Sequence, residues 1–332
     1  MDLYPPTGLA RRRHLLSIAD LERADVERIL ETAEGFESVM HRDVKKVPTL
    51  RGRTVMNVFF ESSTRTSSSF ELAAKRLSAD TVNLKASGSS VDKGESLKDT
   101  ILTLSAYDPD VIVIRHPQAG APALVTRHTD AHVVNAGDGK HQHPTQSLLD
   151  LYTIRKALGQ VEGLQVAIVG DVLHSRVARS NIQALRLLGA KVLLVGPPAL
   201  IPRHAATAMD VTVSHDIGDI AEADVVYVLR MQRERMLEGA NYVPSLAEYS
   251  ALWGVTPERV RPSQLVMHPG PINRGVEIAA EVADSASSRI VDQVRAGLVT
   301  RMAVLYDLLT EPTTRGGQAA LRAVEPAGQE VA

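Results

Sequence analysis

The sequence has no cysteine among its 332 residues. This absence excludes disulfide bonds, thiolate nucleophiles and the common cysteine-containing structural zinc sites. The sequence also lacks an excess of basic residues. Its formal net charge of -2 disfavours nucleic acid as the main partner, because binding to a phosphate backbone requires a basic surface. No stretch approaches the roughly 20 apolar residues of a membrane span. We therefore expect a soluble, cytoplasmic protein that binds neither nucleic acid nor membranes.

Apolar residues recur in a pattern that alternates strands with helices along two successive halves of the chain. Continuous β-branched runs are typical of parallel strands that are buried on both faces. Helices between such strands indicate an α/β fold of two doubly wound parallel-sheet domains, with the active site between them. The predicted strands are Thr54–Phe60, Thr81–Leu84, Val111–Ile114, His132–Asn135, Leu164–Val169, Lys191–Val195, Val211–Ser214, Asp224–Leu229 and Gln264–Met267. The predicted helices are approximately Leu21–Glu34, Ser67–Leu77, Glu95–Ala106, Ala121–Thr129, Pro144–Leu158 and Ser287–Leu309.

The boundary between the two domains is expected at the predicted helix Pro144–Leu158 and the loop that follows it. We assign residues 1–150 to the first domain and residues 151–310 to the second, with the last helix able to pack back on the first. Residues 311–332 are rich in Gly, Pro and Ala, and this composition predicts a flexible tail.

Hydroxyl side chains cluster around a single arginine, Arg65, where the first predicted strand passes into a helix. These residues are Ser62, Ser63, Thr64, Thr66, Ser67, Ser68 and Ser69. An ordinary serine-capped helix needs only one hydroxyl. The N–H groups and dipole at a helix N-terminus attract anions, and a guanidinium can grip two phosphate oxygens in a fork. The stretch therefore predicts a phosphate site at the carboxyl edge of the first sheet.

Two more predicted strand ends carry side chains suited to the same ligand. Arg115 lies just past a buried strand, and His143 lies at a helix start with Gln146 one turn on. Pro144 occupies the first helical position, where proline is favoured. A lone arginine or histidine in such a place is usually structural. Three separate strand ends that carry hydrogen-bond donors for an anion or a carbonyl group together indicate one binding site.

These three motifs resemble, in the same order, the carbamoyl phosphate signature of the aspartate and ornithine transcarbamoylase family. The Ser-Thr-Arg-Thr core corresponds to residues 63–66, and the segments "RHP" and "HPTQ" begin at Arg115 and His143. The resemblance covers about residues 14–310. It implies that carbamoyl phosphate is bound by Ser63, Thr64, Arg65, Thr66, Arg115, His143, Gln146, Gly270 and Pro271.

The second half of the chain points to the amine acceptor. Arg176 stands near a helix start, and Arg230 ends a strand with Gln232 two residues on. Two guanidiniums suit a substrate with two carboxylates, and in the resemblance these residues match those that bind aspartate. Ornithine enzymes of the family share a His-Cys-Leu-Pro segment. Here the corresponding segment, residues 268–278, reads "HPGPINRGVEI", so the resemblance implies aspartate and not ornithine.

The residues leave two alternatives open. The first is a transcarbamoylase with another acceptor, such as an N-acetylated or succinylated amino acid. The second is a catalytically silent, phosphate-sensing protein, which the presence of Arg65, Arg115 and His143 opposes. A dinucleotide site is not expected, because the G-x-G-x-x-G pattern is missing after Val169.

The loop at residues 86–99, "ASGSSVDKGESLKD", offers Ser89 and Lys93 as polar donors. In the family the matching loop reaches into the neighbouring subunit's active site. The resemblance therefore implies a homotrimer with shared sites, in which Ser89 comes from the neighbour and Lys93 binds aspartate there. Family members often carry a second basic residue just before this lysine, where this chain has Asp92. Regulatory chains or other pyrimidine enzymes are further partners that one sequence leaves open.

The resemblance implies that carbamoyl phosphate and L-aspartate give N-carbamoyl-L-aspartate and phosphate, the first committed step of pyrimidine synthesis. The aspartate amine attacks the carbamoyl carbon, and phosphate leaves from a tetrahedral intermediate. The candidate oxyanion donors are Arg115, His143 and Thr66, while Arg65 stabilises the leaving phosphate. Neither a cofactor nor a metal is expected, since the sequence offers no metal-ligand cluster. The departing phosphate is the expected acceptor of the amine proton.

Overall fold

The computed structural model describes residues 14–85, 94–232, 243 and 245–310. Ser89, Lys93 and the predicted tail at residues 311–332 lie outside the described residues. Among the described helices, none combines the length and the apolar character that a membrane-spanning segment requires.

The first half of the chain builds a four-stranded parallel sheet in the order β2-β1-β3-β4. Its strands are β1 (Thr54–Phe59), β2 (Asp80–Lys85), β3 (Val111–His116) and β4 (His132–Asp138). Its helices are α1 (Arg23–Met40), α2 (Thr64–Arg76), α3 (Leu97–Ser105), α4 (Ala121–Val125) and α5 (Pro144–Leu158). Alternate residues of β3 face opposite sides of the sheet, as the pleat requires. Val111 and Val113 belong to the core shared with α1, α2 and α5, while Ile112 and Ile114 pack with residues of α3 and α4.

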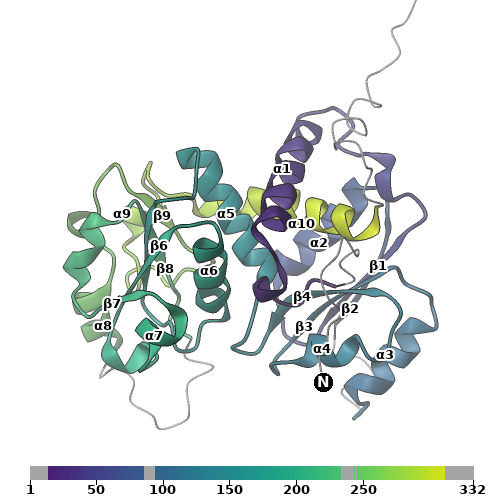
Figure 1. Ribbon diagram of the computed structural model, residues 1–332, viewed down its shortest axis with the longest axis horizontal. Coiled ribbons are helices and arrows are strands. Elements are labelled where there is room, and N and C mark those ends of the chain that lie inside the picture. Colours follow the sequence, from purple (N-terminus) through teal and green to yellow (C-terminus); the bar gives the residue numbers. More distant parts are fainter. Residues whose placement is uncertain (1–13, 86–93, 233–242, 244, 311–332) are drawn as a thin grey trace, which may run out of the picture.

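The second half builds a five-stranded parallel sheet in the order β7-β6-β5-β8-β9. Its strands are β5 (Gln165–Val169), β6 (Lys191–Val195), β7 (Thr212–Ser214), β8 (Val225–Val228) and β9 (Leu265–Met267). Its helices are α6 (Arg176–Leu187), α7 (Ala205–Met209), α8 (Leu246–Trp253), α9 (Ala280–Ala283) and α10 (Ile290–Leu309). Figure 1 shows the two sheets side by side, each with helices around it. The predicted α/β fold with two parallel sheets is confirmed.

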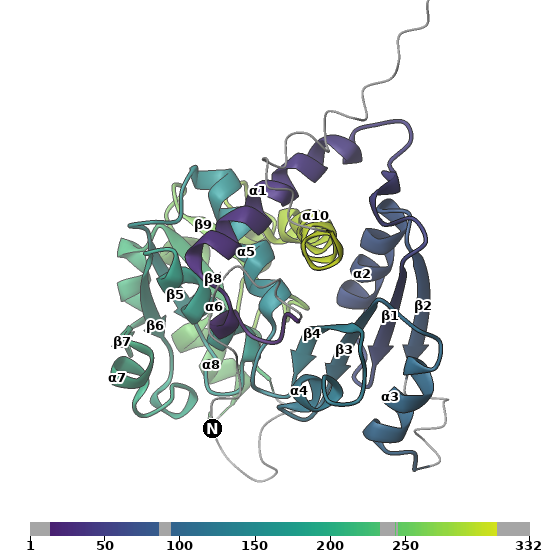
Figure 2. The ribbon, with the colours of Figure 1, turned by 45° about the vertical axis from the view of Figure 1, so that its right-hand side comes forward.

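Helices α5 and α10 connect the two halves. α5 contacts both α6 and α10, and α10 follows the last strand of the second sheet. α10 nevertheless packs against α1, α2 and α5, so the chain returns to the first half, and Figure 2 shows α10 between α1 and α2. Ala296, Val299, Met302 and Ala303 are among its buried residues. This packing holds α10, which follows β9 of the second sheet, against the helices of the first half.

The predicted start of α2 at Ser67 is wrong, because the helix begins at Thr64. Ser63 is its extended N-cap, with φ -159°. Serine and threonine are weak helix formers, so the hydroxyl run suggested a loop. Tertiary packing overrides that preference: the buried face that includes Phe70 and Ala73 anchors α2 on the sheet. Arg65 and the two threonines beside it therefore lie in the first helical turn.

Among the other predicted helices, α3 is shorter at both ends and α10 begins at Ile290 instead of Ser287, while α1 and α4 differ most. Helix α1 runs from Arg23 to Met40 with Glu22 as its N-cap, because Phe36 and Val39 continue its buried face. Asp20, the predicted cap, instead closes a capping box with Ser17 around a short 3-10 turn. Helix α4 ends at Val125 rather than at residue 129, where the run "TRHTD" contains weak helix formers.

Candidate active site

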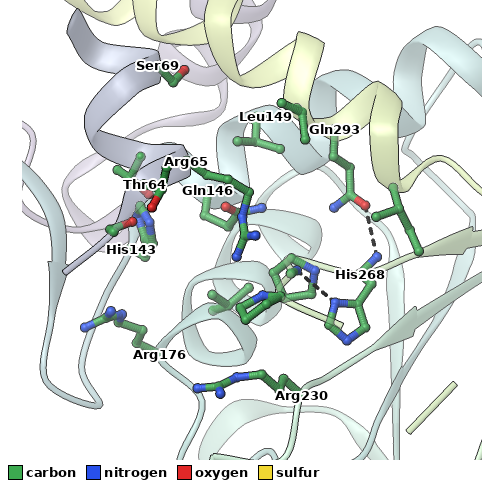
Figure 3. A pocket seen from close by; sticks show the side chains of 18 of the residues that line it. Thr64, Arg65, Ser69, His143, Gln146, Leu149, Arg176, Arg230, His268 and Gln293 are labelled. Atoms are coloured by element: carbon green, nitrogen blue, oxygen red, sulfur yellow. Dashed lines mark hydrogen bonds between the residues drawn. The ribbon is translucent and has the colours of Figure 1, made fainter. Parts of the chain in front are cut away.

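A cavity of about 660 Å³ is lined by residues at the carboxyl ends of strands from both sheets, and Figure 3 shows its side chains. Its walls come from the segments that follow β1, β4, β5, β8 and β9, from the end of β3, and from α10. Of the predicted site residues, the structure brings these to the cavity: Ser63, Thr64, Arg65, Thr66, Arg115, His143, Gln146, Arg176, Arg230, Gln232, Gly270 and Pro271. Their convergence from distant parts of the sequence, Ser63 to Pro271, makes this cavity the candidate active site.

The N-terminus of α2 forms one wall of the cavity. Ser63 is the N-cap residue, yet its side chain makes no capping hydrogen bond. Thr66, in the first turn, is buried. The first N–H groups of a helix have no partner within the helix, and the helix dipole gives this end a partial positive charge. The hydroxyls and the N–H groups of this turn are therefore suited to a multiply charged anion.

Arg65 and Arg230 approach the cavity from opposite sides (Figure 3). The pKa of Arg65 is lowered by desolvation first and by the positive charge of Arg230 second. A Cβ atom at Gly270 would lie 2.9 Å from Cζ of Arg65, and φ of Gly270 is +61°. Only glycine allows both this backbone conformation and this close approach. Two like charges held near each other favour binding of an anion between them.

Glu61 connects two of the predicted arginines. Its Oε2 accepts hydrogen bonds from Nε of Arg115 at 3.0 Å and from Nη2 of Arg176 at 2.7 Å. Arg176 is only 3% exposed, and its Nη1 also donates to the carbonyl oxygen of Gly139 at 3.2 Å. An arginine that begins a helix of the second half thus lies against the first half. Glu61 was not among the predicted residues, although it stands directly between the strand and the hydroxyl run.

His143 and Gln146 occupy the first turns of α5. His143 is the N-cap residue, and its backbone N–H donates to Oγ of Ser180 on α6 at 2.9 Å. Both His143 and Gln146 are buried. Nε2 of Gln146 donates to Oδ1 of Asp150 at 3.0 Å, and burial raises the pKa of Asp150 to about 6. At the start of α5, hydrogen bonds away from the cavity therefore fix the backbone of His143 and the side chain of Gln146.

A buried aspartate positions the residues that follow β8. The backbone N–H of Gln232 donates to Oδ2 of Asp171 at 3.1 Å, and Oδ1 of Asp171 lies 2.8 Å from Nδ1 of His174. The side chain of Gln232 in turn accepts from Nη2 of Arg230 at 3.3 Å. Asp171, in the loop after β5, thus fixes the backbone beside Arg230.

His268 shapes the loop after β9. Its Nδ1 accepts the backbone N–H of Gly270 at 2.8 Å, so its Nε2–H donates to Glu277 at 3.2 Å. Burial lowers the pKa of His268; Glu277 opposes this shift, whereas Arg65 and Arg230 add to it. The ring is therefore held neutral, in one tautomer. Sequence reasoning named Gly270 and Pro271 in this loop but not the histidine that supports them.

Arg301 on α10 is a further residue that the sequence did not reveal. It is buried, and burial lowers its pKa to about 10. Its Nη1 donates to Oγ of Ser69 at 2.8 Å, and its guanidinium carbon lies 5.1 Å from the ring centroid of Phe70. Arg301 thus ties the last helix to α2. Within the described residues, no group of three or more acidic or histidine side chains is placed to hold a metal ion.

Two family models match the chain. The model described as "Aspartate/ornithine carbamoyltransferase, carbamoyl-P binding domain" matches residues 13–156. The model described as "Aspartate/ornithine carbamoyltransferase, Asp/Orn binding domain" matches residues 162–308. The chain belongs to the aspartate/ornithine carbamoyltransferase family. The family resemblance inferred from the motifs is therefore confirmed, and the chain is a carbamoyltransferase.

Curated relatives and solved structures agree with this assignment. The aspartate carbamoyltransferase catalytic subunit of Magnetococcus marinus is 54% identical over 324 residues, which cover 95% of this chain and 98% of the relative. The catalytic subunit of Salinispora arenicola is 57% identical over 303 residues, which cover 90% of this chain and 98% of the relative. Among structures, aspartate transcarbamoylase from Trypanosoma cruzi in complex with carbamoyl phosphate and aspartate has a TM-score of 0.81 and 32% identity, covering 92% of this chain and 99% of that chain. The catalytic subunit of the M. jannaschii enzyme has a TM-score of 0.79 and 35% identity, covering 90% and 98%.

Proposed function

We propose that this chain transfers the carbamoyl group of carbamoyl phosphate to L-aspartate, giving N-carbamoyl-L-aspartate and phosphate. One observation carries the proposal: a helix N-terminus without a side-chain cap and two arginines of the second half line the same cavity. The names of the relatives, and the ligands of the Trypanosoma cruzi structure, support the same substrates. The chain is thus a carbamoyltransferase whose acceptor is aspartate.

The first domain, residues 1–150, binds carbamoyl phosphate. The phosphate group of this substrate lies at the start of α2, against Ser63, Thr64 and the guanidinium of Arg65. The carbamoyl group extends toward the residues that surround the start of α5 and the loop after β9. These residues are Thr66, Arg115, His143, Gln146, Gly270 and Pro271. The second domain, residues 151–310, binds the two aspartate carboxylates through Arg176, Arg230 and Gln232, each of which lines the cavity.

The site accelerates the reaction by stabilising the negative charge that develops on the carbonyl oxygen and on the leaving phosphate. As the neutral amine of aspartate attacks the carbamoyl carbon, the carbonyl oxygen becomes negative, and Arg115, His143 and Thr66 donate to it. A preorganised donor of this kind contributes roughly 2.7–4 kcal/mol to transition-state stabilisation. Arg65 and the α2 dipole then stabilise the departing phosphate. An oxygen of that phosphate accepts the amine proton, which completes the transfer without a side-chain base.

The proposal extends to the assembly and the setting of the enzyme. We infer a homotrimer in which Ser89 and Lys93 of a neighbouring subunit complete each site, acting in pyrimidine biosynthesis in the cytoplasm. Mixing Arg65→Ala chains with Lys93→Ala chains tests the shared site, because a hybrid trimer contains some sites with both residues intact. Recovery of activity on mixing supports sharing, and its absence in trimers shown to have exchanged subunits contradicts it.

The substrate assignment is tested by release of phosphate from carbamoyl phosphate in the presence of different amines. We expect turnover with L-aspartate and none with L-ornithine or with N-acetylated or N-succinylated ornithine. Turnover with one of the acylated amines instead would assign the chain to another acceptor. A crystal structure with N-(phosphonacetyl)-L-aspartate, the ligand of one of the similar structures, should have its phosphonate at α2 and its carboxylates at Arg176 and Arg230.

A further inference from the structure

Asp150 lies on α5, one turn after Gln146, and its carboxylate accepts four hydrogen bonds. Oδ1 accepts from Nε2 of Gln146 at 3.0 Å and from Nε2 of Gln293 at 2.7 Å. Oδ2 accepts from Nδ2 of Asn181 at 2.9 Å and from the hydroxyl of Tyr227 at 2.6 Å. Asp150 is 2% exposed, and its partners come from α5, α6, β8 and α10.

This carboxylate determines which way two glutamine amides face. An ionised carboxylate can only accept hydrogen bonds, whereas an amide can donate through nitrogen or accept through oxygen. Gln146 must therefore turn its nitrogen toward Asp150, which leaves its Oε1 for the cavity that the residue lines. Gln293 likewise turns its nitrogen to Asp150, and its Oε1 accepts the backbone N–H of His268 at 2.9 Å. One buried charge thus orients a cavity side chain and supports the loop after β9.

We propose that Asp150 is a positioning residue that makes the cavity select a carbamoyl group over an acyl group. By holding the Gln146 oxygen toward the cavity, it supplies an acceptor for the –NH2 of carbamoyl phosphate. This inference rests on the proposed function, in which Gln146 contacts that group. Acetyl phosphate carries a methyl group in place of the –NH2. A methyl group cannot satisfy the buried acceptor, so the site binds it more weakly.

The test compares the affinities of carbamoyl phosphate and acetyl phosphate in the full chain by calorimetry. In Asp150→Asn the amide at position 150 no longer forces Gln146 to donate, so Gln146 can turn either way. We expect the preference for carbamoyl phosphate to fall by about 10-fold to 100-fold, because the buried acceptor for its –NH2 is no longer held toward the cavity. The affinity for acetyl phosphate should change by less than about 3-fold.

Tyr227→Phe is the matched control. It removes a donor from Oδ2 of the same carboxylate but leaves the two glutamine bonds at Oδ1. A role that is only structural would lower the stability of both variants and leave the preference unchanged in both. The proposal requires a lower preference in Asp150→Asn alone. Equal preferences in Asp150→Asn and the unchanged chain, or an equal loss in Tyr227→Phe, would overturn it.

The variant Gln146→Ala distinguishes a wrong site assignment from a wrong role for Asp150. If Gln146→Ala leaves the preference unchanged, Gln146 does not contact the carbamoyl group, and the site assignment itself is wrong. If Gln146→Ala lowers the preference but Asp150→Asn does not, only the role of Asp150 fails.

Should Asp150→Asn not fold, the unchanged chain can be labelled with 15N-glutamine. The side-chain NH2 signal that is lost in Gln146→Ala should be protected from solvent exchange before ligand is added. Protection that arises only with carbamoyl phosphate would mean that the nitrogen faces the ligand, contrary to the proposal.

Discussion

Helices α2 and α6 both begin at the cavity, but they differ in how their first turns are capped. In α6, Oγ of the N-cap residue Ser175 accepts the backbone N–H of Ala178 at 3.1 Å. In α2, the N-cap residue Ser63 makes no such bond. A capped end has one of its N–H donors satisfied within the protein. The comparison agrees with the proposal that the first half binds its ligand through a helix terminus, whereas the second half binds its ligand through arginine side chains.

Arg65→Ala should have the largest effect of the variants that test this comparison, because it removes the only guanidinium in the first turn of α2. We expect kcat/KM for carbamoyl phosphate to fall by about 100-fold to 1,000-fold, as for loss of a catalytic anion donor. Arg65→Lys should have a kcat/KM between those of the unchanged chain and Arg65→Ala, since an ammonium keeps the positive charge but cannot donate two parallel hydrogen bonds as a guanidinium does. Steady-state kinetics measures both, and near-normal turnover in the alanine variant would contradict the phosphate assignment.

Arg230→Ala should act on the other half of the site. We expect KM for aspartate to rise by about 10-fold to 100-fold, because a charge-assisted hydrogen bond to a carboxylate is lost. Affinity for carbamoyl phosphate, measured by calorimetry without aspartate, should stay within about 3-fold. Equal losses for the two substrates would show that the halves do not divide the ligands between them.

The serine pair tests the capping difference directly. Ser175→Ala should lower the free energy of unfolding by about 1 kcal/mol, since it removes an N-cap hydrogen bond. Ser63→Ala should leave stability nearly unchanged and should weaken binding of carbamoyl phosphate, because Ser63 lines the cavity and its side chain makes no capping hydrogen bond. Denaturant unfolding gives the free energy of unfolding of each variant, and calorimetry gives its affinity for carbamoyl phosphate. The opposite pattern would remove the distinction between the two helix ends.

The smallest expected effect concerns His268, whose pKa lies below its ordinary value of 6.5. Burial is the main cause, and Arg65 and Arg230 contribute in the same direction. The unfolded chain therefore binds more protons than the folded chain below pH 6.5, so stability decreases as pH falls through that region. Arg65→Gln should raise the pKa of His268 and weaken this pH dependence. NMR titration of the ring follows the shift, and an unchanged pKa would show that Arg65 does not act on His268.

Local signals predicted part of the fold well. Helix α5 has the predicted bounds, because Pro144 suits the first helical position and Gly159 ends the helix with φ +82°. The start of α2 was predicted three residues late, at Ser67 instead of Thr64, because hydroxyl residues disfavour helix until packing against the sheet stabilises it. Sequence patterns thus locate an element better than its ends.

In the candidate site, too, the sequence predicted some residues and missed others. The arginines and histidine that the motifs indicated all reach the cavity, and the family assignment followed from their order. Glu61 and Asp150 were missed, because most of their partners lie far along the chain. Glu61 binds Arg176, and Asp150 binds Gln293. A single carboxylate in a sequence does not reveal which distant donors it will meet.

The amino-acid sequence by itself determined the alternation of strands and helices, the chemical types of the groups that line the cavity and the family to which the chain belongs. These depend on periodicity and on short motifs, which are local. Only the tertiary structure decided which carboxylate holds which donor, which helix ends lack a side-chain cap and which way the Gln146 amide faces. Those features depend on burial and on contacts between segments that are distant in sequence, and only the folded chain brings those segments together.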